Sequence, residues 1–264
     1  MRAIILAAGE GTRLKPYTDN IPKCMVKLAG KPLLHRQIEV LRSMNLEDIM
    51  VVGGYCAKSL DSIGAETSFN SNYMKTNMVA TLFCAEDWMK EEDLLICYGD
   101  IVYEQRVIES LIACNSPIGV SIDKSWKRLW DLRMDDPLSD AETLSLTNSD
   151  RIIEIGKKAT SFDQIDGQYI GLIKVRSDFV RPFKDAWYSL DRQRLYDGKD
   201  LENMYMTSFL QHLIDIDFDV RAAFTENGWL EVDTAEDLEL YERCFHEGTL
   251  KEIINLDKCQ LHQK

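Results

Sequence analysis

The chain has 264 residues, 45% of them hydrophobic and 28% charged, so it can bury a sizeable core and is not mainly disordered. Its formal net charge of −13 disfavours nucleic acid as a partner, and an anionic substrate would need local basic groups or a bound cation. The apolar start, residues 2–8, is too short for a membrane span, and the seven cysteines form no C-x-x-C pair. We therefore expect a cytoplasmic protein that does not contact a membrane.

The first half of the chain alternates strand and helix patterns. Residues 3–8 form an apolar run typical of a buried parallel strand, and Pro32 opens a run with apolar residues at helical spacing. The alternation continues with a strand at 48–54, a helix at 78–89, a strand at 94–98, a helix at 107–114 and a strand at 118–122. Such βαβ units predict an α/β fold around a mostly parallel sheet.

The pattern changes after residue 123. A polar stretch containing tryptophan is followed by short strand-like runs at 144–146, 151–155 and 169–175, which we interpret as a lid-like insertion over the sheet. Helices are expected from about 178 and about 202, then a strand at 220–224. Thr234 to Asp237 resembles a capping box, opening a helix with Leu238, Tyr241 and Phe245 on one face. We predict a single domain over residues 1–264.

The most specific motif is Leu6-Ala-Ala-Gly-Glu-Gly-Thr-Arg-Leu14, completed by Pro22-Lys23. It lacks the Gly-Lys-Ser/Thr of a Walker A loop and the third glycine of a dinucleotide fingerprint. Two glycines after a strand let backbone N–H groups approach phosphates, and Arg13 and Lys23 add positive charge. Taken alone, the same glycines could merely form a turn.

This motif resembles the signature of the nucleotidyltransferase superfamily that activates sugar phosphates and phosphocholine. The resemblance implies a three-layer α/β/α, Rossmann-like fold with a mostly parallel mixed sheet. It also implies a nucleotide held by the backbone around Ala8 and Gly9 and a triphosphate held by Arg13 and Lys23. Asn77 has a second explanation as a helix N-cap, and Gly54 as a turn glycine. The expected nucleotide-binding residues are Leu6, Ala7, Ala8, Gly9, Gly11, Thr12, Arg13, Lys23, Gly54 and Asn77.

Two aspartates are candidate ligands of Mg²⁺, which prefers carboxylate and phosphate oxygens. Asp100 follows the strand at 94–98, at the sheet edge where ligands lie in α/β folds, although Gly-Asp is also a common turn. Asp233 precedes the last predicted helix and could cap it, a role that suits Thr234 better. The resemblance favours Asp100 and Asp233 as metal ligands, with Glu231 as a group that supports them.

The acceptor substrate is expected to meet the insertion. Lys157 would offer a catalytic positive charge together with Arg13 and Lys23, or belong to a surface lysine pair. Tyr169 precedes Gly171 in a strand where a glycine permits close approach. The remaining candidates are suited to a cationic amine, although the tryptophans could equally pack the core. They are Trp126, Glu142 and Trp229.

A narrower resemblance covers nearly the whole chain. Residues 124–126, 140–143 and 202–211 are similar to those of small bacterial cytidylyltransferases of the phosphocholine type and of the phosphoglutamine type used for phosphoramidate decoration of capsules. This implies transfer of CMP from CTP to a small phosphorylated acceptor, L-glutamine phosphate first and phosphocholine second, with release of pyrophosphate. Residues 1–123 would bind the nucleotide, 124–233 would bind the acceptor and form the lid, and 234–264 would form C-terminal helices.

Other functions share part of this pattern. A sugar-1-phosphate nucleotidyltransferase using UTP or dTTP would have the same loop, lysine and carboxylates. A sugar-transferring enzyme would normally show Asp-x-Asp, whereas Asp100 is followed by Ile-Val. A non-catalytic regulatory module would not need both metal ligands. The sequence leaves open a monomer or a homodimer, and whether the apolar residues of 247–264 pack within the chain.

Overall fold

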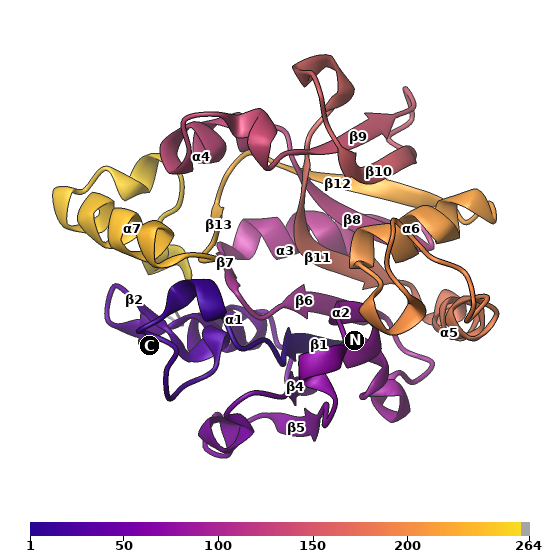
Figure 1. Cartoon of the computed structure of the whole chain (residues 1–264), viewed down its shortest axis with the longest axis horizontal. Coiled ribbons are helices and arrows are strands. Elements are labelled where there is room, and N and C mark those ends of the chain that lie inside the picture. Colours follow the sequence, from indigo (N-terminus) through magenta and orange to yellow (C-terminus); the bar gives the residue numbers. More distant parts are fainter. Residues whose placement is uncertain (260–264) are drawn as a thin grey trace.

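The computed structural model describes residues 1–259, and a seven-stranded mixed sheet forms its centre (Figure 1). The strand order is β12-β8-β11-β6-β1-β4-β5. β11 runs antiparallel to both of its neighbours, whereas the other neighbouring strands are parallel. The strands are β1 (Arg2–Ala7), β4 (Ile49–Gly53), β5 (Glu66–Phe69), β6 (Leu94–Tyr98), β8 (Ile118–Asp123), β11 (Gln168–Val175) and β12 (Val220–Thr225).

Helices cover both faces of this sheet, which confirms the expected three-layer α/β/α architecture. Successive residues of β1 point to opposite faces, so Ile5 packs in one hydrophobic cluster and Ile4 in the other. The Ile5 cluster includes residues of α1 (Leu33–Ser43), α3 (Gln105–Ala113), α4 (Trp126–Arg133) and α7 (Ala235–Glu247). The Ile4 cluster includes residues of α2 (Met78–Phe83), α5 (Val180–Tyr188) and α6 (Met206–Asp215).

Three small two-stranded sheets lie outside the central one. They pair β9 (Glu142–Leu146) with β10 (Ile152–Lys158), β13 (Trp229–Glu231) with β7 (Ile101–Tyr103), and β2 (Lys27–Leu28) with β3 (Lys31–Pro32). The β9–β10 hairpin and α4 lie at one edge of the molecule in Figure 1. The β13–β7 pair brings residues about 130 positions apart in the chain into register, Glu231 beside Ile101.

The insertion is smaller than the sequence pattern suggested. The run at 169–175 belongs to β11, which lies between β8 and β6 in the central sheet, so the segment after residue 123 also completes that sheet. The first part of this segment contains helix α4 and the β9–β10 hairpin. The helix expected at 78–89 ends at Phe83, and a separate 3-10 turn covers Glu86–Trp88.

The C-terminal segment packs against the chain itself. Leu250, Ile253 and Ile254 are all buried, and the Gly228 N–H donates to the Ile253 carbonyl at 2.7 Å. In α7, by contrast, Phe245 is 40% exposed rather than part of the buried face. Residues 260–264 of the predicted C-terminal region lie outside the described residues. Among the helices that the structure describes, none has the length and apolar character required to cross a membrane.

Candidate active site

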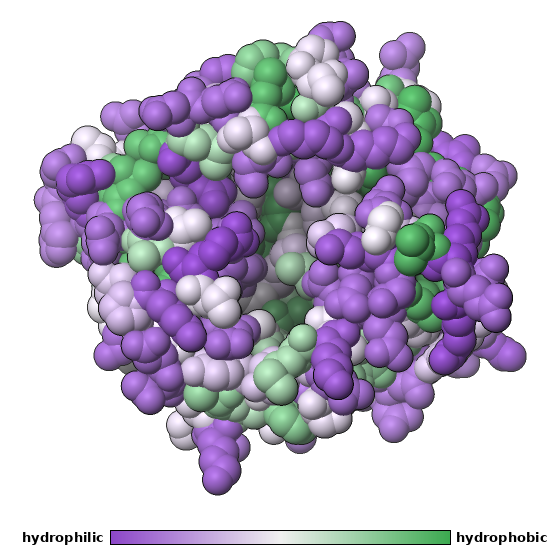
Figure 2. Space-filling view, in the orientation of Figure 1, coloured by the Kyte–Doolittle hydropathy of each residue, from purple (hydrophilic) through white to green (hydrophobic). Residues whose placement is uncertain are grey.

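A deep hollow opens at the carboxyl ends of β1 and β6 (Figure 2). Two adjoining pockets form it, and both are lined by Met78 and Tyr98. The first pocket lies against the N-terminal loop and the start of α2. The second pocket lies among β9, β11 and β13, each of which contributes residues to its wall. The position agrees with the rule that ligands of α/β sheets bind outside the carboxyl ends of strands.

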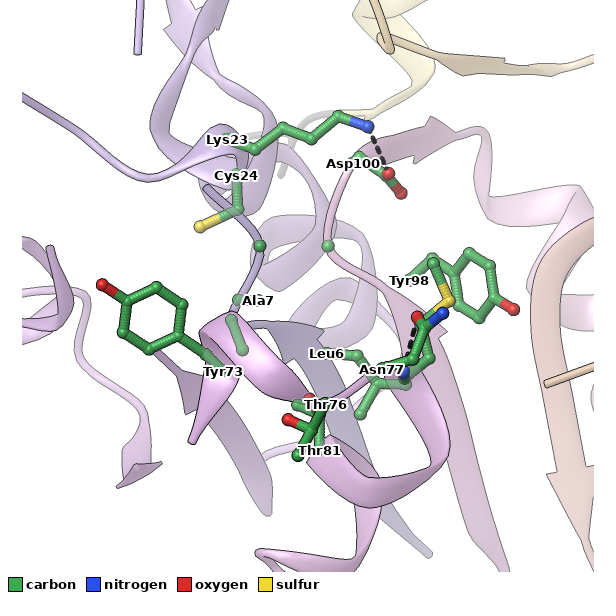
Figure 3. Close-up of a pocket in the computed structure, with 14 residues that line it drawn as sticks. Leu6, Ala7, Lys23, Cys24, Tyr73, Thr76, Asn77, Thr81, Tyr98 and Asp100 are labelled. Carbon is green, nitrogen blue, oxygen red and sulfur yellow. Dashed lines mark hydrogen bonds and ion pairs between the residues drawn. The ribbon is translucent and has the colours of Figure 1, made fainter. Parts of the chain in front are cut away.

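The first pocket is lined by the start of the N-terminal motif and by Lys23 (Figure 3). Its walls include the predicted residues Leu6, Ala7, Ala8, Gly9, Lys23 and Asn77. Asn77 has the cap function as well, because its Oδ1 accepts from the Met78 N–H at 2.8 Å. Tyr73, Thr76 and Thr81 complete the wall opposite the loop, and the sequence pattern did not single them out.

Two glycines shape this pocket without lining it. Gly11 has φ +67°, in the left-handed region, and a Cβ there would lie 2.9 Å from Cβ of Lys23. A Cβ on Gly54 would meet the Ala8 carbonyl oxygen at 2.7 Å. Gly11 and Gly54, both predicted to bind the nucleotide, therefore contribute by allowing close packing against Lys23 and Ala8, which do line the pocket. Thr12 is exposed in the 3-10 turn that follows Gly11, and it lines neither pocket.

Three carboxylates meet where the two pockets join. Asp100, Glu231 and Asp233 each offer an oxygen within 4.8 Å of the others. The Lys23 ammonium lies between two of them, 2.6 Å from Asp100 Oδ2 and 2.8 Å from Asp233 Oδ1. Arg13 reaches the same group, with Nη2 2.5 Å from Asp233 Oδ2. Residues distant in the sequence thus form one charged cluster, as the metal hypothesis required.

The protonation of this cluster follows from its burial. Burial by itself would lower the pKa of Lys23, but Asp100, Glu231 and Asp233 raise it overall, so the lysine stays charged. Burial and the neighbouring Asp100 raise the pKa of Glu231 to about 7. A carboxyl with that pKa would ionise fully once a further cation joined the group.

The cluster fits a divalent cation. Oδ1 of Asp100 is buried and has no hydrogen-bond partner among the residues that the structure describes, an expensive arrangement for a carboxylate oxygen. A hard cation such as Mg²⁺ bonds to oxygens of this kind. Glu231, expected only to support the metal ligands, is itself a member of the cluster. Its spacing of two residues from Asp233 could have indicated this, because residues two apart in extended backbone face the same side.

The second pocket combines carboxylates with aromatic rings. Of the predicted acceptor residues, Glu142, Tyr169 and Trp229 line it, and so does Arg13. The Trp229 Nε1–H donates to Asp123 at 2.8 Å, which holds the indole in place. Further walls of this pocket come from residues outside the predicted acceptor set. They include Tyr98, Trp130, Asp140, Gln168 and Tyr205.

Two predicted acceptor residues lie elsewhere. Trp126 is buried, packs edge-on against Trp130 with ring centroids 5.5 Å apart and lines neither pocket, which favours its packing explanation. Lys157 is 56% exposed and pairs with Glu154 at 2.5 Å, and it lines neither pocket. Its side chain is held by a neighbour three residues away on the same hairpin, as for a surface lysine.

Burial in the second pocket raises the pKa of one of its carboxyl groups. The pKa of Glu142 rises to about 7, mainly because the side chain is buried and secondly because Asp140 lies nearby. A cationic group placed in this pocket would restore the ionised form. The pocket therefore has the charge and the aromatic surface to receive an ammonium group.

The fold and this site define a nucleotidyltransferase. Residues 3–127 match the family model of the MobA-like NTP transferase domain. The chain is 46% identical over 250 residues to CTP:phosphoglutamine cytidylyltransferase of Campylobacter jejuni subsp. jejuni serotype O:2, covering 91% of this chain and 98% of that protein. It is also 40% identical over 91 residues to choline-phosphate cytidylyltransferase of Streptococcus pneumoniae, which is 33% of this chain and 40% of that one.

Solved structures agree on the fold. CTP:phosphocholine cytidylyltransferase of Streptococcus pneumoniae superposes with a TM-score of 0.66 at 20% identity, covering 92% of this chain and 98% of that one. The inositol-1-phosphate CTP transferase of T. maritima gives 0.70 at 22% identity, covering 96% and 97%. The chain belongs to the cytidylyltransferase family of nucleotidyltransferases. Its reaction is therefore the transfer of a cytidylyl group to a small phosphorylated molecule.

Proposed function

We propose that this enzyme transfers CMP from CTP to L-glutamine phosphate and releases pyrophosphate, with phosphocholine as the second candidate acceptor. The observation that carries the proposal is the similarity to the Campylobacter jejuni enzyme, which extends over 98% of that protein and so includes the acceptor half. The similarity to choline-phosphate cytidylyltransferase covers 33% of this chain. A match over a third of the chain supports the choice of acceptor less than the match over nearly the whole Campylobacter jejuni protein does.

The second pocket supports an acceptor that carries an ammonium group. Asp140 and Glu142 supply negative charge, and Trp130, Trp229 and Tyr205 supply aromatic faces. Glutamine phosphate has an ammonium group and a carboxylate beside its phosphate. Arg13 would meet an anionic group at the end of the pocket next to the carboxylate cluster.

The first pocket supports the nucleotide. Backbone groups of Ala7, Ala8 and Gly9 would face the base and ribose, with Asn77 on the opposite wall. Lys23 lies at the junction of the pockets, where it would meet the phosphates. Its ammonium now pairs with Asp100 and Asp233, and bound phosphates would compete for it.

We further propose that the reaction depends on Mg²⁺. Asp100, Glu231 and Asp233 would hold the ion, whose contribution is to neutralise charge on the phosphates. The support is the buried Asp100 oxygen that has no hydrogen-bond partner within residues 1–259, and the position of the cluster between the pockets.

Catalysis would then consist of positioning and charge neutralisation. An oxygen of the acceptor phosphate forms a bond to the α-phosphorus of CTP, and the bond from that phosphorus to the bridging oxygen breaks as pyrophosphate leaves. The phosphoryl group of either acceptor carries at least one ionised oxygen at pH 7, so no side chain needs to remove a proton from the nucleophile. Arg13 and Lys23 would bring together two anions that repel each other.

The experiment that tests this function is a pyrophosphate-release assay with a panel of substrates. CTP, UTP and dTTP would each be combined with L-glutamine phosphate, phosphocholine and glucose 1-phosphate, with Mg²⁺ or with EDTA. We expect the highest kcat/KM for CTP with glutamine phosphate, and loss of turnover in EDTA. Turnover of UTP with glucose 1-phosphate but not of CTP would refute the proposal.

The setting of the reaction follows from the same comparison. We propose that the enzyme acts in the cytoplasm, where CTP is available, and that its product contributes to the decoration of a capsule polysaccharide. Deleting the gene and measuring phosphoramidate on the cell surface would test this part, because unchanged decoration would contradict it.

A further inference from the structure

Arg133 is a buried cation close to the candidate active site but outside both pockets. It is the last residue of α4, and its side chain is 4% exposed. It does not line either pocket, so it is not placed to touch a substrate. Burying an arginine costs the hydration of its charge, so it is expected only where partners inside the protein compensate for that loss.

The guanidinium contacts two carboxylates of the site region. Its Nε donates to Asp237 Oδ1 and its Nη2 to Asp237 Oδ2, both at 3.0 Å, which is the two-pronged geometry that arginine forms with a carboxylate. Its Nη1 lies 3.5 Å from Glu231 Oε2. Glu231 is one of the three carboxylates of the charged cluster. One side chain therefore holds groups on β13 and on α7 at once.

Asp237 connects Arg133 to a second member of the cluster, Asp233. Its Oδ2 accepts from the backbone N–H of Asp233 at 3.2 Å and from that of Thr234 at 3.0 Å. Arg133, by holding both oxygens of Asp237, sets where these backbone groups lie. The backbone of Asp233 carries the side chain that meets Lys23 and Arg13.

Helix capping alone does not account for the arginine. The capping box of α7 is complete with Thr234 and Asp237, whose side chains each accept from the other's backbone N–H. A buried ion pair is weak evidence for a contribution to stability, because desolvation offsets much of the attraction. The third nitrogen of Arg133 faces Glu231, which is not part of the cap.

Arg133 also touches the wall of the second pocket. Its guanidinium carbon lies 5.7 Å from the centre of the Trp130 ring, which lines that pocket. The Trp130 Nε1–H donates to Asp140, another wall residue, at 3.1 Å. The same arginine is thus in contact with the acceptor side and with the carboxylate cluster.

We propose that Arg133 is a positioning residue that orients Glu231 and Asp233 for binding a divalent cation. It acts on Glu231 directly and on Asp233 through Asp237. This inference rests on the cation site of the proposed function. Residues that orient metal ligands in this way typically change metal affinity or activity by 10-fold to 100-fold when they are replaced.

The test compares Arg133→Lys and Arg133→Met with the unmodified enzyme. Mn²⁺ binding would be measured by electron paramagnetic resonance without substrates, and kcat and KM for CTP would be measured separately. Removing the positive charge by itself would tighten cation binding, so the lysine variant, which keeps the charge, reports the orientation alone. We expect the lysine variant to bind Mn²⁺ about 10-fold more weakly and to lose about 10-fold in kcat, with a smaller change in KM for CTP.

Arg176→Lys is the matched control. Arg176 forms the same two-pronged contact with Asp178, at 2.6 and 2.9 Å, but follows β11 at the end of the sheet opposite the site. We expect it to leave Mn²⁺ affinity and kcat unchanged. An equal loss in this control would mean that the effect at Arg133 is not specific to the site, and would overturn the inference.

A further variant keeps the inference testable if the Arg133 variants do not fold. Asp237→Asn keeps Arg133 and its contact with Glu231 but weakens the link to Asp233, and we expect weaker Mn²⁺ binding from a folded protein. Unchanged Mn²⁺ affinity and kcat in folded Arg133→Lys, or unchanged Mn²⁺ affinity in Asp237→Asn, would overturn the inference. If the unmodified enzyme binds no Mn²⁺, the cation site of the proposed function fails first, and the inference fails with it.

Discussion

Asp100 has a buried oxygen with no partner among the described residues and a second oxygen paired with Lys23. Replacing Asp100 by Asn removes a charge from the cluster while preserving its shape. We expect kcat to fall roughly 100-fold or more, because the phosphates lose charge neutralisation in the transition state. The fold should be kept, which circular dichroism and the melting temperature would check.

Asp131→Asn is a suitable control for that experiment. Asp131 lies on the exposed side of α4 and pairs with Lys127, with both side chains 51% exposed. An exposed pair of this kind contributes little to stability, so this variant should match the unmodified enzyme in kcat and melting temperature. Full activity in Asp100→Asn would show that the metal assignment is wrong.

Glu142 makes the stability of the protein depend on pH. Its pKa in the folded state is about 7, raised by burial and by Asp140 from an ordinary value of 4.5. The folded protein therefore binds this proton more tightly than the unfolded chain does, and the stability contributed by Glu142 declines as pH rises from about 4.5 to 7. Glu142→Gln removes this dependence.

Urea denaturation at pH 5 and pH 8 would measure the effect. We expect the free energy of unfolding of Glu142→Gln, relative to the unmodified protein, to be higher at pH 8 than at pH 5 by up to about 3 kcal/mol. The sign would reverse if Glu142 were held ionised by a cation in the free protein. The same variant should raise KM for the acceptor, because the pocket loses a carboxylate.

The candidate site residues differ in how well the sequence identified them. Asp100, Asp233 and Lys23 converge because each follows a strand or loop whose end lies at one edge of the sheet. Lys157 and Trp126 do not, because a residue's place in a hairpin or on a helix face depends on tertiary packing that spacing does not encode. Arg133 gave no signal at all, since its partners lie about 100 residues further along the chain.

At the scale of elements, the start of α7 joins helix stability to site geometry. Thr234 Oγ1 accepts from the Asp237 N–H at 3.0 Å, and Asp233 immediately precedes this cap. We expect Thr234→Ala to lower the free energy of unfolding by about 1 kcal/mol, the usual cost of losing such a cap. It should lower kcat by less than Asp237→Asn, because Asp237 would still hold the Asp233 N–H.

Thr249→Ala provides the comparison at the other end of the same helix. Thr249 Oγ1 donates to the Cys244 carbonyl at 3.3 Å, so the variant tests loss of a polar contact with α7 away from the site. We expect a small loss of stability and an unchanged kcat. If Thr234→Ala lost as much activity as Asp237→Asn, the cap and not the Asp237 carboxylate would control the site.

Elements with strong local patterns were predicted closely. The strand at 94–98 has those bounds in the structure, because a continuous apolar run bounded by polar residues suits a strand buried on both faces. β5 was missed, because this edge strand is mostly exposed and lacks an apolar run. The role of 169–175 as a central strand was also missed, since the partners of an antiparallel strand inserted between parallel ones are set by the whole sheet.

For the whole molecule, the carboxylate cluster joins parts of the chain that local structure leaves separate. Asp100 follows β6. Glu231 is the last residue of β13, the strand that pairs with β7, and Asp233 follows it two residues later. A cation shared by these groups, with a nucleotide in the adjoining pocket, would stabilise the folded state because the unfolded chain offers no such site.

CTP and Mg²⁺ together, without acceptor, should therefore raise the melting temperature. At 100 times its dissociation constant a ligand contributes about 2.7 kcal/mol, which corresponds to roughly 5–8 °C for a chain of this size. Scanning calorimetry with CTP in Mg²⁺ and in EDTA would separate the metal-dependent part, which Asp100→Asn should lose. A rise of equal size in EDTA would mean that nucleotide binding does not use the carboxylates, and that Arg13 and Lys23 hold the phosphates alone.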